Sequence, residues 1–383
     1  MPSFKTTPED FVVDEIPAYA PSGAGDHLYV TFKKRALTTD HAVRRMAEVL
    51  GVEPRDVGVA GLKDKVAVTT QTISFPLGPK LTAEDAETAL RALPTVGQET
   101  EDENDRVHFE LLGVSRHPNK LRTGHLRGNR FSLWVRGVSA EEAALAHARI
   151  EAAHRHGIPN TFGDQRFGRH GDNGTRALAF IRGETRPPRD PRQARFLFSA
   201  FQSLLFNTLL DERVADGTFG VPAEGELVMR HRSVLAGEGD EERGALFLVR
   251  GDELADTVAR AERLEVSPTG PMWGAKMRKP EGPALARELE LLSRHGLEEA
   301  SLSKFSRLGE GVRRSLRLFP EELRVTADET DMQLQFVLPK GAYATEVLAW
   351  LFPGGLREPI KAGATPPSDS PSSCTTSGIQ LMR

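Results

Sequence analysis

The chain has 383 residues, of which 39 % are hydrophobic and 27 % charged, a balance typical of a globular protein with two or three folding units. A single cysteine, Cys374, excludes a disulfide framework and fits a reducing cytoplasm. No run approaches the roughly 18 apolar residues of a membrane span, and the N-terminus lacks a secretory pattern. We therefore expect a cytoplasmic protein without a membrane partner.

The first half of the chain is predicted to alternate irregularly between strands and helices. Thr38 and Thr39 are suitable N-caps for a helix that continues to Leu50 and stops at Gly51. The expected strands are residues 10–16, 27–33, 57–60, 72–75, 107–114 and 129–138, and the expected helices are residues 39–50, 83–93 and 140–156. Because no βαβ unit repeats, the pattern indicates an α+β fold with a mainly antiparallel sheet.

The amino-acid composition changes around residues 183–192, where Gly, Pro and Arg predict a loop or a domain boundary. Further helices are expected at residues 194–214, 252–262, 282–294 and 345–352, and strands at 323–326 and 332–338. We predict that residues 187–318 form an inserted domain between the two parts, 1–186 and 319–363, of the first domain. Residues 364–383 are rich in Pro, Ser and Thr, and we expect them to be disordered.

The segment from Gly61 to Gln71 places Asp64 between Lys63 and Lys65, in a loop between two predicted strands. Flanking ammonium groups favour the ionised carboxylate, so the loop is suited to presenting one reactive oxygen. An Asp in a Gly-containing turn is also a common structural device, because its side chain bonds the local backbone. The loop alone leaves both interpretations open.

The charge distribution is uneven. The net charge of −4 is not typical of a nucleic-acid binder, yet residues 116–195 hold sixteen Lys or Arg against seven Asp or Glu. In this stretch a segment with spaced glycines could hold phosphates through its backbone amides, Lys120 and Arg122, or it could be a basic hairpin turn. Asn129, in the same segment, is a further candidate substrate-binding residue. Basic residues interleaved with aromatic ones indicate binding of a partly single-stranded nucleic acid, and the alternative is a solvated basic surface.

Two further segments combine aromatic and polar residues. Residues 160–168 contain two glycines and two phenylalanines in nine positions. Such a loop could stack on a base and hydrogen-bond it, or it could be a turn pinned by buried rings. Its candidate binding residues are Asn160, Phe162, Gln165 and Arg166. Tyr343 follows a predicted strand at a helix start, where it is either a stacking ring or a residue at the rim of the core.

Motifs of several cofactor sites are absent from the sequence. No Gly-rich dinucleotide fingerprint follows a strand, no Walker-type lysine loop occurs, and no His or Cys cluster has metal-ligand spacing. We expect neither a cofactor nor a metal.

Five segments together resemble motifs of the TruD family of tRNA pseudouridine synthases. The segment from Gly61 to Gln71 is similar to the family's catalytic motif. The other four follow the family's order: Pro8 to Val13 resembles its start, Asn160 to Gly168 its second motif, Ser199 to Asn207 the helix that opens its inserted domain, and Lys340 to Thr345 its C-terminal motif. The matches run from about residue 5 to about residue 352, which is nearly the whole chain.

The resemblance implies a pseudouridine-synthase-like catalytic domain with an inserted α+β (TRUD) domain. It implies an enzyme that converts the uridine at tRNA position 13 to pseudouridine, with tRNA as its partner. Asp64 would be the essential nucleophile or base, Lys5 would pair with it, and Tyr343 would be the ring beside the target uracil. Asn160 and Phe162 would contact the pocket or shape it. We expect the enzyme to act as a monomer.

Two positions depart from the family pattern. Thr161 stands where the family commonly has Tyr, so stacking at that loop would rest on Phe162. Residues 349–351, Ala-Trp-Leu, replace the more usual Arg-Glu-Leu, which would alter a support contact and leave the chemistry unchanged.

The implied reaction breaks the N1–C1′ bond of uridine and joins C5 to C1′, without electron transfer or hydrolysis, so it needs no cofactor. Extruding the uridine costs a few kcal/mol, and stacking on a ring such as Tyr343 returns about 1–3 kcal/mol. The carboxylate of Asp64 either attacks C1′ or removes a sugar proton. Because adjacent side chains of an extended loop point to opposite sides, Lys5, which only the resemblance nominates, is a better partner for Asp64 than Lys63 or Lys65.

Two other functions are compatible with parts of the sequence. A non-catalytic RNA-binding protein would need the basic and aromatic surface but not Asp64. A sugar or nucleotide hydrolase would need a second carboxylate at a defined separation, and no second acidic motif is present.

Overall fold

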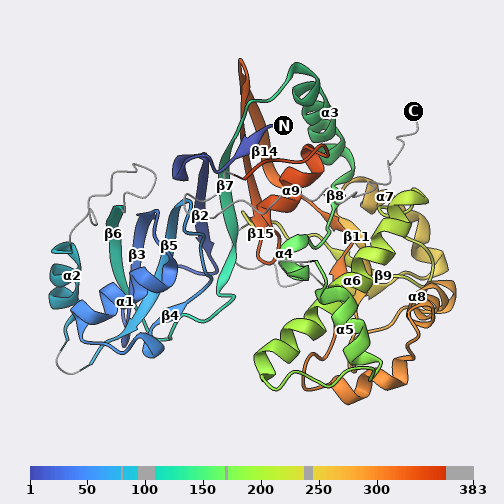
Figure 1. The fold of residues 1–383 in the computed structure, drawn as a ribbon, viewed down its shortest axis with the longest axis horizontal. Helices are drawn as coiled ribbons and strands as arrows, with labels where there is room; N and C mark the ends of the chain where they lie inside the picture. The colour runs from blue at the N-terminus through green and yellow to red at the C-terminus, as the bar shows by residue number, and fades with distance from the viewer. Residues whose placement is uncertain (79–80, 94–107, 169–170, 237–244, 359–383) are drawn as a thin grey trace, which may run out of the picture. The chain divides into compact units, whose positions relative to one another are not determined.

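The computed structural model describes residues 1–78, 81–93, 108–168, 171–236 and 245–358 (Figure 1). The chain forms two compact units. The first comprises Met1–Glu151, Ser233–Asp240 and Pro320–Pro359, and the second comprises Ala152–Arg232 and Glu241–Phe319. The domain limits predicted from the sequence, at residues 187 and 318, stay predictions. The predicted tail, 364–383, lies outside the described residues.

The first unit is built on a nine-stranded sheet with the order β14-β15-β7-β2-β5-β3-β6, in which β1 also pairs with β7 and β4 with β5. Its strands are β1 (Ser3–Phe4), β2 (Phe11–Pro17), β3 (His27–Arg35), β4 (Gly58–Val59), β5 (Val68–Pro76), β6 (His108–His117), β7 (Leu126–Arg136), β14 (Glu321–Asp328) and β15 (Asp331–Pro339). Of its described strand pairs, β2 with β5 is parallel and the others are antiparallel. The predicted α+β class with a mainly antiparallel sheet is confirmed.

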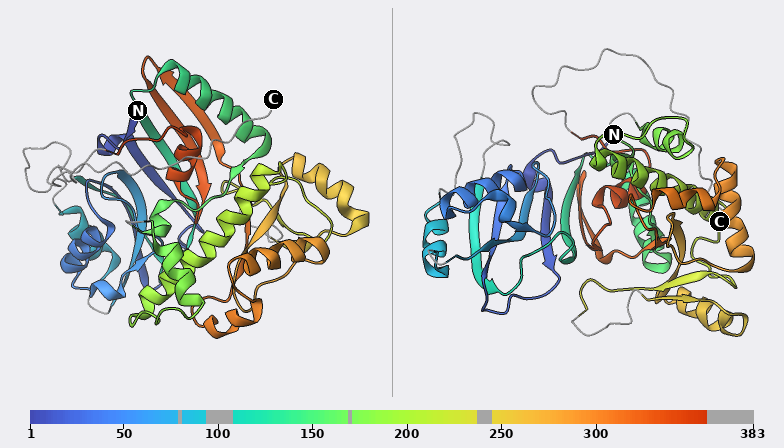
Figure 2. Two further views of the ribbon diagram at one scale, coloured as in Figure 1. Left: turned by 45° about the vertical axis from the view of Figure 1, so that its right-hand side comes forward. Right: turned by 90° about the horizontal axis from the view of Figure 1, so that it is seen from below.

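Helix α1 begins and ends where the sequence predicts, whereas α2 ends two residues before its predicted end and α9 is shifted by one residue. Thr38 accepts a hydrogen bond from the backbone N–H of His41, and Gly51 ends the helix with a left-handed φ of 64°. The helices are η1 (Pro8–Asp10), α1 (Thr39–Leu50), η2 (Pro54–Asp56), α2 (Ala83–Arg91), α9 (Ala344–Leu351) and α3 (Ala140–His156), whose last residues belong to the second unit. Figure 1 shows α1 and α2 beside β3, β5 and β6, while α3 and α9 lie near β14 and β15 (Figure 2).

The buried face of this sheet is apolar over most of its area and polar at one end. Under α1 and α2 it carries side chains such as Phe32 and Ile73, which pack with Leu37 and Met46. Towards the end of β3 and the start of β5 the same face carries buried Lys34, Thr69 and Gln71. This polar end lies beneath the loop that carries Asp64.

The second unit surrounds a long helix, α6 (Pro191–Ala215), which begins at the N-cap Asp190. Its other helices are α4 (Asp164–Phe167), α5 (Asn173–Ile181), η4 (Gly251–Glu253), α7 (Leu254–Glu262), α8 (Gly282–Arg294) and η5 (Glu299–Phe305). A four-stranded antiparallel sheet has the order β10 (Leu246–Leu248), β9 (Leu227–Arg230), β11 (Val266–Met272) and β12 (Val312–Ser315), and β13 (Arg317–Leu318) pairs with β8 (Ile158–Pro159). No helix in the described ranges is long and apolar enough to cross a membrane.

Candidate active site

The loop between β4 and β5 presents the carboxylate of Asp64 to solvent, with 57 % of its side chain exposed. The Nζ atom of Lys5 lies 3.0 Å from Asp64 Oδ2, and only 11 % of the Lys5 side chain is exposed. The structure thus brings together two of the predicted site residues, which are far apart in the sequence. Their roles in catalysis stay predictions.

The N-terminal segment is held so that Lys5 reaches Asp64. Strand β1 pairs with β7, and the backbone N–H of Phe4 donates to the carbonyl of Arg357 at 3.1 Å. Lys5 itself has a left-handed φ of 56°, a conformation that costs a residue with a side chain roughly 1–2 kcal/mol. Its ammonium group lies 4.2 Å from the ring centre of Phe11 and 3.8 Å from Glu358 Oε1. The ammonium group therefore has an aromatic and a second acidic neighbour besides Asp64.

The motif at residues 8–13 supports this segment through two ion pairs. Arg35 donates to both carboxylate oxygens of Glu9, at 2.5 and 3.2 Å, and these bonds lower the pKa of Glu9. Asp10 is buried, accepts the backbone N–H of Thr7, and pairs with Arg136 at 2.6 Å. The acidic residues of the motif therefore fasten the chain on the C-terminal side of Lys5.

The two lysines that flank Asp64 in sequence lie in environments that differ from that of Lys5. Lys63 turns inward and donates to Glu15 Oε2 at 2.7 Å, and both side chains of this pair are buried. Glu15 also accepts the backbone N–H of Thr72 at 3.3 Å, which ties β2 to β5. Lys65 is exposed. The charge of Lys63 is therefore matched by Glu15, on the other side of the loop from the carboxylate of Asp64.

Buried polar groups hold the loop from below. The hydroxyl of Thr39 accepts the backbone N–H of Lys63 at 2.9 Å and donates to Gln71 Oε1 at 3.0 Å. The Nζ atom of Lys34 donates to the carbonyl of Asp64 at 2.9 Å. The motif's Gln71 therefore supports the loop through Thr39.

Sequence reasoning did not select Lys34, Thr39 or Glu15 as site residues. Lys34 follows the predicted strand 27–33, Thr39 was interpreted only as a cap, and Glu15 was placed in a strand. Each supports the loop from a strand end or a helix start that lies next to it only in the fold. A usable signal exists only for Glu15, whose charge lies within the predicted strand 10–16, because a charged residue in a buried strand needs a partner.

Tyr343 precedes α9 and exposes 41 % of its surface. It follows Gly341, whose φ of 83° turns the chain sharply after β15. Lys340, in the same turn, donates to the carbonyl of Gly124 at 3.1 Å. The ring is therefore available for stacking, although the described contacts include none between Tyr343 and Asp64.

The candidate binding residues Lys120, Arg122 and Asn129 do not share one surface element. Lys120 and Arg122 lie in the connection between β6 and β7, where Lys120 donates to the carbonyl of Arg55 at 3.3 Å and Arg122 is exposed. Asn129 lies within β7, opposite Glu15 on β2, and its Oδ1 atom is buried without a described partner. Asn129 therefore belongs to the buried sheet and not to the basic connection.

Phe162 is not the exposed stacking ring that the sequence suggested. Its ring is only 6 % exposed, meets Phe206 edge to face at 5.6 Å, and lies 4.1 Å from the guanidinium carbon of Arg314. Asn207 on α6 accepts the backbone N–H of Phe162 and donates to its carbonyl, at 2.9 and 2.8 Å. The ring lies in a buried core cluster of the second unit, as in the alternative of a turn pinned by buried rings, and its role in a substrate pocket stays a prediction.

Asn160 is likewise engaged within the second unit. Its Nδ2 atom donates to the carbonyl of Ser315 at 2.8 Å, and its Oδ1 accepts from Arg314 at 2.5 Å. Its backbone carbonyl also accepts from Arg314. Arg314 thus links Asn160 to the ring of Phe162, a role that its position in a short, unpredicted strand does not reveal.

The remaining predicted residues of this segment lie in α4. Arg166 is half-buried and donates to the hydroxyl of Ser199 on α6 at 2.9 Å. Gln165 belongs to the same short helix, and its side chain lies outside the described part of the structure.

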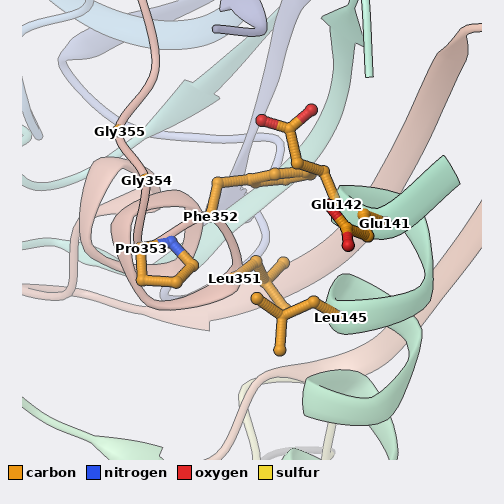
Figure 3. Close-up of a pocket in the computed structure, with 8 residues that line it drawn as sticks. All are labelled: Glu141, Glu142, Leu145, Leu351, Phe352, Pro353, Gly354 and Gly355. Carbon is orange, nitrogen blue, oxygen red and sulfur yellow. The ribbon is translucent and has the colours of Figure 1, made fainter. Parts of the chain in front are cut away.

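A pocket in the first unit involves none of the predicted site residues. It has a volume of about 350 Å³ between the first turns of α3 and the end of α9 (Figure 3). Its lining consists of Glu141, Glu142, Leu145, Leu351, Phe352, Pro353, Gly354 and Gly355. Glu142 is already bonded to the N-cap Ser139. No three His, Cys, Asp or Glu side chains of the described residues gather in a way that could hold a metal ion.

Comparison with known proteins decides the family. The profile of tRNA pseudouridine synthase D (TruD) matches residues 2–186 and 190–350. This chain belongs to the TruD family of tRNA pseudouridine synthases. A tRNA pseudouridine synthase D from Anaeromyxobacter sp. (strain Fw109-5) is 44 % identical over 373 residues, covering 95 % of this chain and 94 % of the relative. One from Thermus thermophilus is 37 % identical, covering 90 % and 86 %.

The TruD fold is also found by structural similarity. The crystal structure of the putative tRNA pseudouridine synthase D from Methanosarcina mazei matches with a TM-score of 0.67 and 22 % sequence identity, covering 92 % of this chain and 93 % of that one. At this identity the likeness concerns the fold alone. It agrees with the α+β class expected from the sequence.

Proposed function

We propose that this TruD-family chain isomerises uridine to pseudouridine at position 13 of tRNA, with Asp64 as the reacting carboxylate. One observation carries the proposal above the others: Asp64 is exposed and ion-paired at 3.0 Å with Lys5, inside the motif that resembles the catalytic motif of the family. A carboxylate that served only the turn would have its oxygens directed at local backbone groups. The hydrogen bond of Asp64 Oδ2 instead comes from a residue 59 positions away.

The reaction needs one ionised carboxylate next to the sugar and a positive group near it. The N1–C1′ bond breaks, the uracil turns, and C5 joins C1′, while C5 loses a proton and N1 gains one. Asp64 either attacks C1′ or abstracts a sugar proton, and Lys5 orients it. Because atoms and electrons balance within uridine, the proposed reaction requires no cofactor.

The exposed ring of Tyr343 is the proposed stacking partner of the extruded uracil. Stacking on an aromatic face is worth about 1–3 kcal/mol per base, which offsets part of the cost of unpairing and unstacking the uridine. The segment at residues 160–168 is proposed to shape the substrate pocket through Asn160 and Phe162.

The test is incubation of the purified protein with unmodified tRNA, followed by mapping of pseudouridine at every position. We expect modification at position 13, none when that uridine is replaced by cytidine, and none with the Asp64→Asn variant. Asp56→Asn, in an exposed 3₁₀ turn, is the matched control and should retain full yield. Tight tRNA binding without pseudouridine would identify a non-catalytic RNA-binding protein, and pseudouridine at another position would overturn the proposed substrate site.

A further inference from the structure

Lys34 is fully buried, with 0 % of its surface exposed, at the polar end of the core face of β3. It follows Phe32 on that face, and its neighbours across the sheet are Thr69 on β5 and Phe109 on β6. Lysine is almost never fully buried unless its charge has partners. Here the partners are backbone carbonyls, those of Leu37 at 2.6 Å and of Asp64 at 2.9 Å.

The turn from β3 into α1 holds the Asp64 loop at three points. The ammonium group of Lys34 bonds the carbonyl of Asp64, and the hydroxyl of Thr39 bonds the N–H of Lys63. Further along the loop, the backbone N–H of Ala36 donates to the carbonyl of Ala67 at 3.4 Å. Of these contacts, only that of Lys34 is made to Asp64 itself and carries a charge.

We propose that Lys34 is a positioning residue, which fixes the backbone of Asp64 through its charged ammonium group and so aims the carboxylate at the reacting sugar. The proposal rests on the proposed role of Asp64. The ammonium group neither touches substrate nor reacts. Removing its charge, by substitution or by alkaline pH, loosens the loop and slows the reaction, because displacement of a reacting group by about 1 Å can cost on the order of 100-fold in rate.

Burial lowers the pKa of Lys34 to about 8. The carboxylate of Asp64 opposes this shift, and the ammonium group of Lys63 adds to it. The neighbours on β5 and β6, Thr69 and Phe109, are uncharged, as are Leu37 and Thr39 at the start of α1. Lys34 therefore loses its proton in an accessible pH range.

Activity and stability respond to this proton in opposite directions. As pH rises through about 8, Lys34 becomes neutral and its bond to the Asp64 carbonyl weakens, so the rate falls. The unfolded chain retains the ordinary lysine pKa of 10.5. Between these two values the unfolded state binds more protons than the folded state, so the contribution of Lys34 to stability rises with pH. A purely structural role would make activity and stability change together.

The experiment measures single-turnover pseudouridine formation with saturating enzyme from pH 6.5 to 9.5, together with thermal unfolding at each pH. For the wild type we expect a rate that falls through about pH 8 while the unfolding temperature does not fall in parallel. The Lys34→Met variant should be about 10–100-fold slower at pH 7. Its rate should not fall as pH rises through 8, and its unfolding temperature should not be lower than that of the wild type. Lys33→Met, one residue earlier and on the opposite face of β3, is the matched control and should behave like the wild type.

Hydrogen exchange of the peptide covering residues 61–67 gives a readout that does not depend on activity. Exchange should be faster in Lys34→Met and unchanged in Lys33→Met. The proposal is overturned if Lys34→Met keeps the wild-type rate, the fall in rate through pH 8, or the wild-type hydrogen exchange of residues 61–67. Each of these results leaves the role of Asp64 intact. If the variant does not fold, a wild-type rate that is flat across pH 8 overturns it equally. Absence of pseudouridine in the wild type instead contradicts the proposed function.

Discussion

The Asp64 loop and the segment at residues 160–168 are both held by hydrogen bonds from side chains to their backbone. They differ in the exposure of the side chain that each one carries. In the first, Lys34 and Thr39 bond the backbone and leave the carboxylate of Asp64 exposed. In the second, Asn207 bonds the backbone of Phe162, whose ring is buried as well. Similar fastening therefore leaves an exposed carboxylate in one segment and a buried ring in the other.

This difference predicts two classes of substitution. Some should reduce activity without changing the unfolding temperature, and others should lower the unfolding temperature first. A residue that acts at the exposed end of the Asp64 loop has little packing to lose. A residue that fastens the 160–168 segment leaves buried polar groups without partners when it is removed. The following variants test that division, from the largest expected effect to the smallest.

Lys5→Met should have the largest effect. The substitution keeps a side chain of similar length and removes the ammonium group, which is the described cation that lies over Phe11 and donates to the Asp64 carboxylate. Loss of one pre-positioned donor in an active site typically costs about 100- to 1000-fold in kcat. Single-turnover rates and unfolding temperatures would be measured together. Lys276→Met, which breaks the exposed pair of Lys276 with Glu310, is the control and should leave the rate unchanged. A large fall in unfolding temperature with a normal rate in Lys5→Met would reverse the assignment.

Tyr343→Ala should come next, because it removes the exposed ring while the buried ring of Phe162 remains. Loss of stacking worth about 1–3 kcal/mol corresponds to a roughly 5- to 150-fold fall in kcat/KM. Tyr343→Phe retains the ring face and should keep most of the activity. Equal losses in the two variants would show that the hydroxyl, not the face, is what matters.

Asn207→Ala should show the opposite profile from Lys5→Met. It leaves the buried N–H and C=O of Phe162 unsatisfied, at a cost of about 1–3 kcal/mol for each group. Thermal unfolding should therefore begin several degrees lower. Thr208→Ala, whose hydroxyl bonds only the carbonyl of Leu204 in its own helix, is the control and should lose much less stability. An unchanged unfolding temperature with a lost rate would place Asn207 among the catalytic supports.

Substitution of Lys120 and Arg122 should have the smallest effect. If each neutralises one tRNA phosphate, the double change to Gln weakens binding uniformly and reduces the slope of log K against log salt by about 0.7–0.9 per contact. The dissociation constant would be measured over a series of salt concentrations. Arg91→Gln, on the exposed surface of α2, is the control. An identical slope in both proteins would remove Lys120 and Arg122 from the phosphate contacts.

Much of the first unit is predictable because its signals are local. Thr38 and Gly51 mark the two ends of α1, and the alternation of residues along β3 and β15 indicates their buried sides. The pairing of Lys5 with Asp64 has no local signal, and only the family resemblance nominated it. The burial of Lys34 is equally invisible in the sequence, since a lysine at the end of a strand usually lies in solvent.

In the second unit the sequence predicts the helices α6, α7 and α8, but other elements are harder to predict because they break local rules. β11 contains Pro268 and Pro271, which normally argue against a buried strand. The strand pairs with β9 up to Pro268 and with β12 from Thr269 onward, so neither partner requires an unbroken row of its N–H groups. The sequence does not predict α5 either, because the helix starts with Asn173-Gly-Thr, a sequence that is more typical of a loop than of a helix. The sequence leaves two environments open for Phe162, because no local pattern distinguishes a ring on a Gly-rich loop from a ring beneath one.

The position of β7 in the sheet has a consequence for synthesis of the chain on the ribosome. β7 ends at Arg136, while its neighbour β15 begins at Asp331. At about 5–20 residues per second, on the order of ten seconds or more of translation separate the two strands. During that interval one long edge of β7 has no partner, the condition under which strands associate with other chains. Ser3 meets Arg357 later still, so the clamp that holds Lys5 against Asp64 is completed only as the last described residues are made. The contacts that position Lys5 beside Asp64 are therefore among the last that the nascent chain completes.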